Sequence, residues 1–193
     1  HYFAHMKDSK HVVIVGCGVA GLALALALKK AGIRYTVLER APELGFVGAG
    51  IQLSPNATRV LSRLNVLERI APRLVRPGHH RFVDWQSASP LLTTPLGDVV
   101  ASTFGSLYGH AHRADLLHGF VDALGPDANI RLGVEVEQVG NENGKAFALC
   151  TDGTRVVGDV VVAADGVRSA IREAQFAPSS PSHSGCMAWR GLT

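Results

Sequence analysis

Apolar residues near the start of the chain fall in blocks whose spacing changes from that of a buried strand to that of a helix and back. Residues 11–15 form an unbroken, largely β-branched run, which is typical of a central strand covered on both faces of a parallel sheet. Residues 22–30 are rich in leucine and alanine and stop at Gly32, so they predict a buried helix. Residues 35–38 predict a second strand that ends at Glu39. Together these segments predict a βαβ unit.

The next stretch predicts one more helix and then a change of architecture. Ser54 and Pro55 supply a helix-capping residue and the proline favoured in the first turn, so we expect a helix from Pro55 through Leu64. The side chains expected to face inward are Ala57, Val60, Leu61 and Leu64. Residues 81–85 and 91–94 predict short, proline-broken strands of a separate antiparallel layer.

The second half of the chain predicts elements that rejoin the domain of the βαβ unit. A helix is expected to open at residues 112–115 and to run through Leu124. The pairs Asn143-Gly144 and Asp152-Gly153 are strong hairpin signals and predict a three-stranded meander. The expected strands are 129–132, then 134–139, 145–151 and 154–157 in the meander, and a buried run at 160–164 before a short helix at 169–172. The sequence therefore predicts an α/β fold with a parallel sheet and a β-meander.

Composition narrows the class of protein. The chain has 47% hydrophobic and 18% charged residues, and Lys29 and Lys30 end its longest apolar run well short of the roughly 20 residues that a membrane span needs. The net charge of +3 comes from dispersed residues, so no nucleic-acid or membrane partner is expected. Three cysteines match no disulfide framework, which favours a cytoplasmic location. The nine histidines have no partners at ligand spacing, so no metal is expected.

The glycine motif between the first strand and the helix is the first candidate binding site. It runs Gly16-Cys17-Gly18-Val19-Ala20-Gly21. Gly16 permits a tight turn, Gly18 lets the backbone approach a pyrophosphate, and Gly21 lets the helix pack on the strand. Because the helix start offers free N–H groups to phosphates, the motif, Ala20 included, predicts a site for the ADP half of a dinucleotide.

Two residues after the second strand refine this site. A carboxylate at Glu39 can accept hydrogen bonds from the adenosine ribose, which favours NAD or FAD over NADP. Arg40 could stack on the adenine or could equally be a solvated surface arginine. These residues alone do not separate FAD from NAD.

A resemblance to a known family favours FAD over NAD. Four stretches of the sequence carry it, and they follow one another in the same order as in the family. The chain resembles the N-terminal part of the class A flavoprotein monooxygenases, in particular the salicylate-hydroxylase-like aromatic hydroxylases with the para-hydroxybenzoate-hydroxylase fold. The stretches are Gly16 to Gly21 with Glu39-Arg40, Gly48-Ala49-Gly50-Ile51 with Ser54-Pro55-Asn56, His112-Arg113-Ala114-Asp115-Leu116, and Asp159 through Asp165-Gly166-Val167-Arg168-Ser169. The resemblance implies a Rossmann-like FAD-binding domain and the first part of an antiparallel substrate domain.

The resemblance also implies roles for single residues. Gly48, Ala49 and Gly50 would line the flavin, and Arg113 would reach the FAD phosphate or ribityl region. Asp165, with Gly166, would support the pyrophosphate region, partly through Arg113. Without the resemblance, Arg113 would be a solvated arginine at a helix start and Asp165 an ordinary turn residue.

The activity implied is hydroxylation of a phenolic or carboxylated aromatic substrate by O₂, with FAD as cofactor and NADH or NADPH as external reductant. Arg190, in Ala188-Trp189-Arg190-Gly191, is the catalytic candidate, since such an arginine faces the substrate in the family; the alternative is a strand-surface arginine. It would stabilise a substrate carboxylate or phenolate and make the ring carbon more nucleophilic.

The chain departs from the family pattern in its second half. The family has a late Gly-Asp motif, but the pairs Gly97-Asp98 and Gly158-Asp159 do not follow a buried strand into a helix and cannot stand in for it. The sequence therefore resembles an N-terminal portion of such an enzyme. We expect an FAD-binding domain at residues 6–78 and 105–178 and the start of a substrate domain at 79–104 and 179–193. An unpaired sheet edge could also support a homodimer. The alternatives are an FAD-linked epoxidase or reductase on the same scaffold, and a non-catalytic nucleotide-binding module.

Overall fold

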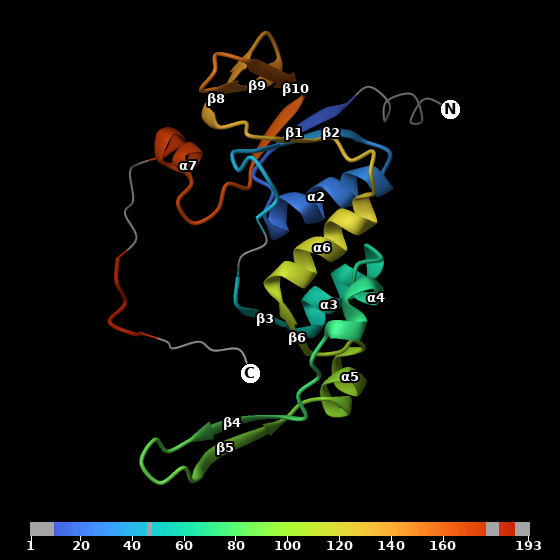
Figure 1. Cartoon of the computed structure of the whole chain (residues 1–193), viewed down its shortest axis with the longest axis vertical. Coiled ribbons are helices and arrows are strands. Elements are labelled where there is room, and N and C mark those ends of the chain that lie inside the picture. The colour runs from blue at the N-terminus through green and yellow to red at the C-terminus, as the bar shows by residue number, and fades with distance from the viewer. Residues whose placement is uncertain (1–9, 46–47, 177–181, 188–193) are drawn as a thin grey trace. The chain divides into compact units, whose positions relative to one another are not determined.

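The structure is a computed structural model that describes residues 10–45, 48–176 and 182–187 (Figure 1). The chain divides into two compact units. Among the described residues, the first unit comprises 10–45, 120–176 and 182–187, and the second comprises 48–119. Each unit has its own sheet structure, so each is described by itself.

A four-stranded parallel sheet forms the centre of the first unit. Its strand order is β11-β1-β2-β7, so the β-branched run that the sequence places at the centre is an interior strand, as predicted. β1 pairs with β2 in the register Val13↔Thr36 and with β11 in the register Val13↔Val161. The bounds are β1 His11–Val15, α2 Val19–Lys30, β2 Arg34–Glu39, β7 Ile130–Leu132 and β11 Val160–Ala163.

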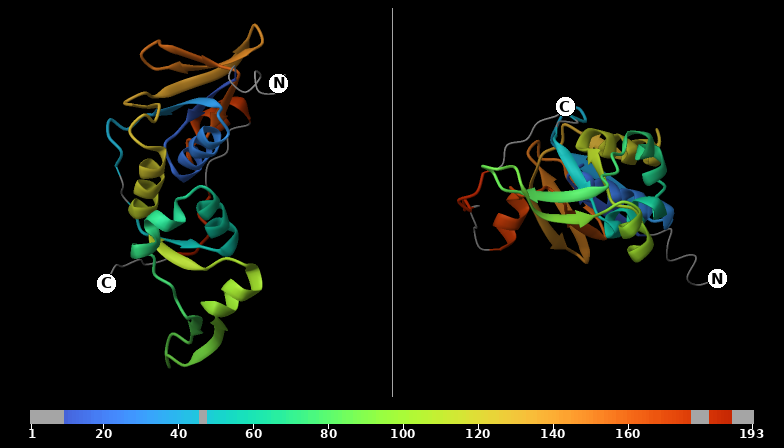
Figure 2. Two further views of the ribbon diagram at one scale, coloured as in Figure 1. Left: turned by 90° about the vertical axis from the view of Figure 1, so that its right-hand side faces the viewer. Right: turned by 90° about the horizontal axis from the view of Figure 1, so that it is seen from below.

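The two faces of this sheet carry different partners. Val13, Val15 and Leu38 face a buried cluster that includes residues of the meander, whereas Ile14 points the opposite way, toward Gly21 of α2. This alternation follows from the two-residue period of a strand. Figure 2 shows the meander on one side of β1 and β2 and α2 on the other. The remaining elements of this unit are β8 Val136–Glu142, β9 Lys145–Cys150, β10 Arg155–Gly158 and α7 Ala170–Gln175.

The prediction of a fully buried strand at residues 160–164 was wrong. β11 is only partly covered, and the side chain of Val160 is 49% exposed. The reason is position, since β11 lies at the edge of the sheet within the described residues and pairs only with β1. An apolar run of this length does not distinguish an interior strand from an edge strand.

The second unit is built around a short antiparallel pair and the helices that follow it. β3 pairs with β6 in the register Gly50↔His112 to Leu53↔Gly109, a ladder that the sequence analysis did not predict. α3 has Pro55 in its first turn as predicted, but the Ser54 hydroxyl contacts the Asn56 side chain and makes no capping bond. The elements are β3 Gly50–Leu53, α3 Pro55–Arg63, α4 Leu67–Ile70, the 3₁₀ turn Ala71–Arg73, β4 His79–Val83, β5 Pro90–Pro95, α5 Asp98–Phe104 and β6 Gly109–His112. α6, Arg113–Leu124, begins in this unit and ends in the first.

Two further comparisons with the sequence concern the second unit. Leu61 and Leu64 are buried as predicted, but Val60 is 50% exposed, so its inward assignment was wrong. β4 and β5 form the predicted antiparallel pair, and every residue of both strands is exposed.

Across the described segments, no helix is both long enough and apolar enough to cross a membrane.

A network around Asp159 joins β1 to the β10–β11 connection. Its Oδ2 accepts a hydrogen bond from the His11 backbone N–H at 2.7 Å, and its Oδ1 accepts one from Lys145 Nζ at 2.7 Å. Lys10 Nζ lies 3.7 Å from the same oxygen. The hydrogen bonds from Lys145 and His11 lower the pKa of Asp159 to about 2.

The Asp159 network predicts a dependence of stability on pH. A carboxyl group whose pKa is lower in the folded chain stabilises the fold at a pH above its unfolded pKa, and this stabilisation is lost as pH falls through the folded value. We therefore expect unfolding by urea to become easier between about pH 4 and pH 2, and Asp159→Asn to weaken this dependence. Asp98→Asn, at an exposed carboxylate, serves as the control and should leave the loss of stability at acid pH unchanged. An equal loss of stability at acid pH in wild type and Asp159→Asn would contradict the role given to Asp159.

Candidate functional site

The glycine loop at the carboxyl end of β1 has the geometry that its sequence predicts. Gly16 has φ +103°, a conformation that side chains disfavour, and its N–H donates to Leu38 O at 2.8 Å. A Cβ on Gly16 would lie 2.4 Å from Ala164 O, and one on Gly21 would lie 2.0 Å from Gly16 O. Both positions therefore require glycine for close backbone packing.

Gly18 differs from its two neighbours in the motif. It is the residue before α2, with φ −80° and ψ −173°, and apart from Gly18 and its two chain neighbours no heavy atom lies within 4 Å of the place that its Cβ would occupy. α2 has no side-chain cap and no acidic residue in its first turn, while Lys29 and Lys30 lie in its last turn. The helix therefore presents an open, electropositive start, which fits a pyrophosphate.

Glu39 joins the end of β2 to the glycine loop. Its Oε2 accepts a hydrogen bond from Cys17 N at 2.7 Å, and its Oε1 accepts one from Ala41 N at 3.0 Å. A carboxylate can accept about four hydrogen bonds, so both oxygens keep capacity for ribose hydroxyls. The bond to Cys17 was not predicted, because a contact across 22 residues leaves no periodic signal in the sequence.

Cys17 lies in this loop but is poorly suited to be a nucleophile. Its side chain is buried, and burial, with a smaller effect of the Glu39 carboxylate, raises the pKa of the thiol to about 11. The reactive form is the thiolate, so little of Cys17 is reactive near neutral pH. Cys186, in contrast, is exposed.

We expect alkylation to separate these cysteines. With iodoacetamide at pH 8, Cys17 should react at least about a hundredfold more slowly than Cys186, because both its thiolate fraction and its access are reduced. Peptide mass spectrometry over a time course measures the two rates. Buried Cys150, whose pKa is also raised by burial, is an internal comparison and should resemble Cys17. Labelling of Cys17 as fast as Cys186 would show that the loop is open.

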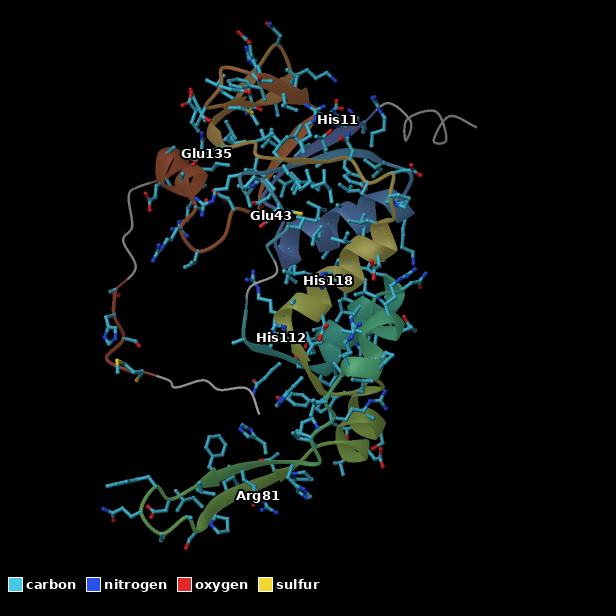
Figure 3. The ribbon with its side chains drawn as sticks, in the orientation of Figure 1. His11, Glu43, Arg81, His112, His118 and Glu135 are labelled. Carbon is cyan, nitrogen blue, oxygen red and sulfur yellow. The ribbon has the colours of Figure 1, made fainter. Side chains whose placement is uncertain are left out.

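Within the second unit, Gly48 and Arg113 are brought together. A Cβ on Gly48 would lie 2.8 Å from Arg113 Cβ, so the glycine makes room for the arginine side chain, which is itself exposed. Arg113 N donates to Ala49 O at 3.2 Å, which extends the β3–β6 ladder beyond Gly50. His112, labelled in Figure 3, accepts a hydrogen bond at Nδ1 from Ala114 N at 3.2 Å and so caps α6. This cap was missed, since histidine is not among the usual capping residues.

The Asp-Gly motif lies next to the glycine loop in the first unit. Ala164 N donates to Val15 O at 2.7 Å, and the Asp165 Cα would lie 3.1 Å from a Cβ on Gly16. The Asp165 carboxylate accepts a long bond, 3.5 Å, from Ile171 N at the start of α7. Gly166 is exposed with φ +87°. The carboxyl ends of β1 and β11 therefore meet at one edge of the sheet.

The remaining predicted residues are less defined by the structure. Ala20 and Arg40 are exposed. Arg190 lies outside the described residues. No group of three or more histidine, cysteine, aspartate or glutamate residues within the described ranges could hold a metal ion.

Comparison with known proteins identifies the family. Residues 9–192 match the family described as FAD binding domain. The chain is 39% identical to 3-amino-4-hydroxybenzoate 2-monooxygenase of Streptomyces cremeus, over 94% of this chain and 45% of that protein. It is 35% identical to salicylate hydroxylase of Pseudomonas putida, over 97% of this chain and 45% of that protein.

The solved structures agree with the sequence matches. Klebsiella pneumoniae HpxO complexed with FAD and uric acid matches with a TM-score of 0.77 and 26% identity, over 90% of this chain and 44% of that one. The chain spans about half the length of the curated relatives it matches. The α/β fold with a parallel sheet and the choice of FAD over NAD are thereby confirmed. The chain belongs to the FAD-binding-domain family, within which it is similar to the salicylate-hydroxylase-like aromatic monooxygenases.

Proposed function

We propose that the protein containing this chain is an FAD-dependent monooxygenase that hydroxylates a small phenolic or carboxylated aromatic substrate with O₂, using NADH or NADPH as reductant. The observation that carries the proposal is the open start of α2, next to a glycine loop tied to Glu39, in a chain of this family. The names of the relatives support the substrate class, since they act on aminohydroxybenzoate, hydroxynicotinate, hydroxybenzoate and salicylate.

When bound, FAD supplies the redox chemistry. The protein binds and orients the cofactor and the substrate and excludes water from the site. We assign the pyrophosphate to Gly16, Gly18, Ala20 and Gly21, with Asp165 and Gly166 in support. Glu39 would accept the ribose hydroxyls, and Arg40 would lie against the adenine. Gly48, Ala49 and Gly50 would line the flavin, Arg113 would donate to its phosphate or ribityl oxygens, and Arg190 would hold the substrate anion. The fit rests on the free space at Gly18 and the uncapped α2.

We further propose that residues 6–78 and 105–178 belong to the flavin domain and that 79–104 and 179–193 belong to the substrate domain. The fully exposed β4–β5 pair supports this, because an isolated two-stranded ribbon is stable only when other structure covers it. A homodimer through the exposed edge of β11 and a cytoplasmic location also belong to the proposal. Analytical ultracentrifugation tests the dimer.

The test of the activity uses the whole protein encoded by the gene, loaded with FAD. Oxygen uptake and NAD(P)H oxidation are followed with a panel of hydroxybenzoates, an aminohydroxybenzoate and a hydroxynicotinate. The proposal predicts that at least one substrate couples both signals to a hydroxylated product. NAD(P)H oxidation without oxygen incorporation would instead support a reductase. No consumption with any member of the panel would reject the proposed activity.

A further inference from the structure

A second polar site lies at the amino ends of the strands, away from the glycine loop. A cavity of about 580 Å³ that is open to solvent is lined there by the start of β1, the α2–β2 turn, the start of β2 and the segment that leads into β7. Its volume falls in the range of small-molecule sites, roughly 300–1,000 Å³. β1 separates it from Gly16 by five residues, or about 16 Å at the rise of a strand. The cavity is therefore distinct from the dinucleotide site.

Strand alternation places a polar floor in this cavity. His11 and Arg34 are paired across β1 and β2, and Thr36 follows on the same face. Thr36 is 1% exposed, and its Oγ1 lies 2.9 Å from His11 Nε2 and accepts from Asn129 Nδ2 at 3.0 Å. The other nitrogen of His11 lies 3.1 Å from Val157 O. These contacts fix the floor, and His11, labelled in Figure 3, lies beside the meander.

The charges around the floor are mostly positive. Arg34, Arg131 and Lys29 line the cavity, and Asp127 is the carboxylate among the lining residues. Lys29 Nζ donates to Leu124 O, which fixes the position of its charge. Asp159 lies near the His11 backbone but is held by Lys145. The cavity therefore carries an excess of positive charge over a floor whose polar side chains are held in place by hydrogen bonds to one another.

We propose that this cavity binds the phosphate group of a small molecule. A phosphate carries about −1.5 to −2 charges at pH 7 and so matches an excess of positive charge better than a monoanionic carboxylate does. The planar guanidinium groups of Arg34 and Arg131 suit phosphate oxygens. This site is independent of the proposed hydroxylation, which uses the opposite edge of the sheet.

The test is a titration of the ¹⁵N-labelled chain with inorganic phosphate at constant ionic strength. We expect the amide resonances of Arg34, Thr36 and Asn129 to shift along one saturation curve. Arg131→Gln should weaken the apparent affinity by about tenfold, as expected for loss of a charged hydrogen bond. Arg81→Gln, which removes an equal charge from exposed β4, should leave the affinity unchanged. Benzoate should bind more weakly than phosphate.

Several outcomes would overturn the proposal. Shifts confined to residues 16–21 would place phosphate at the dinucleotide loop only. Equal shifts with chloride would show a general salt effect, and equal shifts with benzoate would reject phosphate as the ligand class. Equal affinities for Arg131→Gln and Arg81→Gln would show that the cavity is not the site. Arg34→Gln is the second variant, and a wild-type amide spectrum for each variant shows that it folds.

Discussion

Gly21→Ala is expected to destabilise the first unit by about 3 kcal/mol, a large overpacking effect. The added Cβ would lie 2.0 Å from Gly16 O and 3.4 Å from Ile14 Cγ2. The first contact is with backbone of the glycine loop, which is itself fixed by a bond to Leu38 O, so no flexible side chain can move aside. Urea unfolding followed by circular dichroism measures the loss.

The same motif offers a matched control for Gly21→Ala. Gly18→Ala adds the same methyl group where no atom beyond its chain neighbours lies within 4 Å, at a residue with φ −80°. Its cost should stay below about 1 kcal/mol, which is the effect of a poorer residue before the helix. A loss for Gly18→Ala as large as that for Gly21→Ala would show that tight packing is not what requires the glycines.

Glu39→Ala is expected to lower both stability and FAD affinity. The change leaves the backbone N–H groups of Cys17 and Ala41 without their acceptor, and an unmade hydrogen bond to a buried group costs about 1–3 kcal/mol. Under the proposed function it also removes the acceptor for the ribose hydroxyls, so FAD affinity should fall by about tenfold or more. Urea unfolding and a fluorescence titration with FAD measure the two effects separately.

Glu43→Ala is the control for Glu39→Ala. It removes an exposed carboxylate four residues further along the chain, at a residue whose backbone carbonyl accepts from Gly45 N at 2.9 Å. Its stability and FAD affinity should match those of the wild type. If Glu39→Ala lost stability but kept full FAD affinity, Glu39 would only anchor the glycine loop, and the ribose assignment would be wrong.

Local signals in the sequence predicted the first unit well. The glycine motif, the Asn143-Gly144 and Asp152-Gly153 turns and the unbroken apolar run at β1 each depend on residues close in sequence. The pairing of β1 with β2 follows from the βαβ unit, because parallel neighbours need a helical crossover. Such signals do not say which other elements pair with a strand or cover it. The edge position of β11 and the exposure of Val160 were therefore missed.

Contacts between distant residues were the second gap. The β3–β6 ladder pairs segments about sixty residues apart, and each strand has only four residues, too few for a sequence pattern to mark it as a strand. The approach of Ala164 O to Gly16 is a backbone contact that no side chain encodes. The sequence therefore predicted which residues would form the site, while the geometry shows why Gly16 and Gly21 must be glycine and that open space lies beside Gly18.

The central claim is that the loop around Gly18 holds the pyrophosphate of FAD. Equilibrium dialysis of wild type and Gly18→Ala against FAD, read by flavin absorption, tests it most directly, because dialysis detects weak binding as well as tight binding. We expect saturable binding by the wild type and affinity lower by at least about tenfold in Gly18→Ala, since the new methyl group occupies the approach to the backbone N–H groups. Equal binding by both proteins, or none by the wild type up to about 1 mM FAD, would contradict the claim.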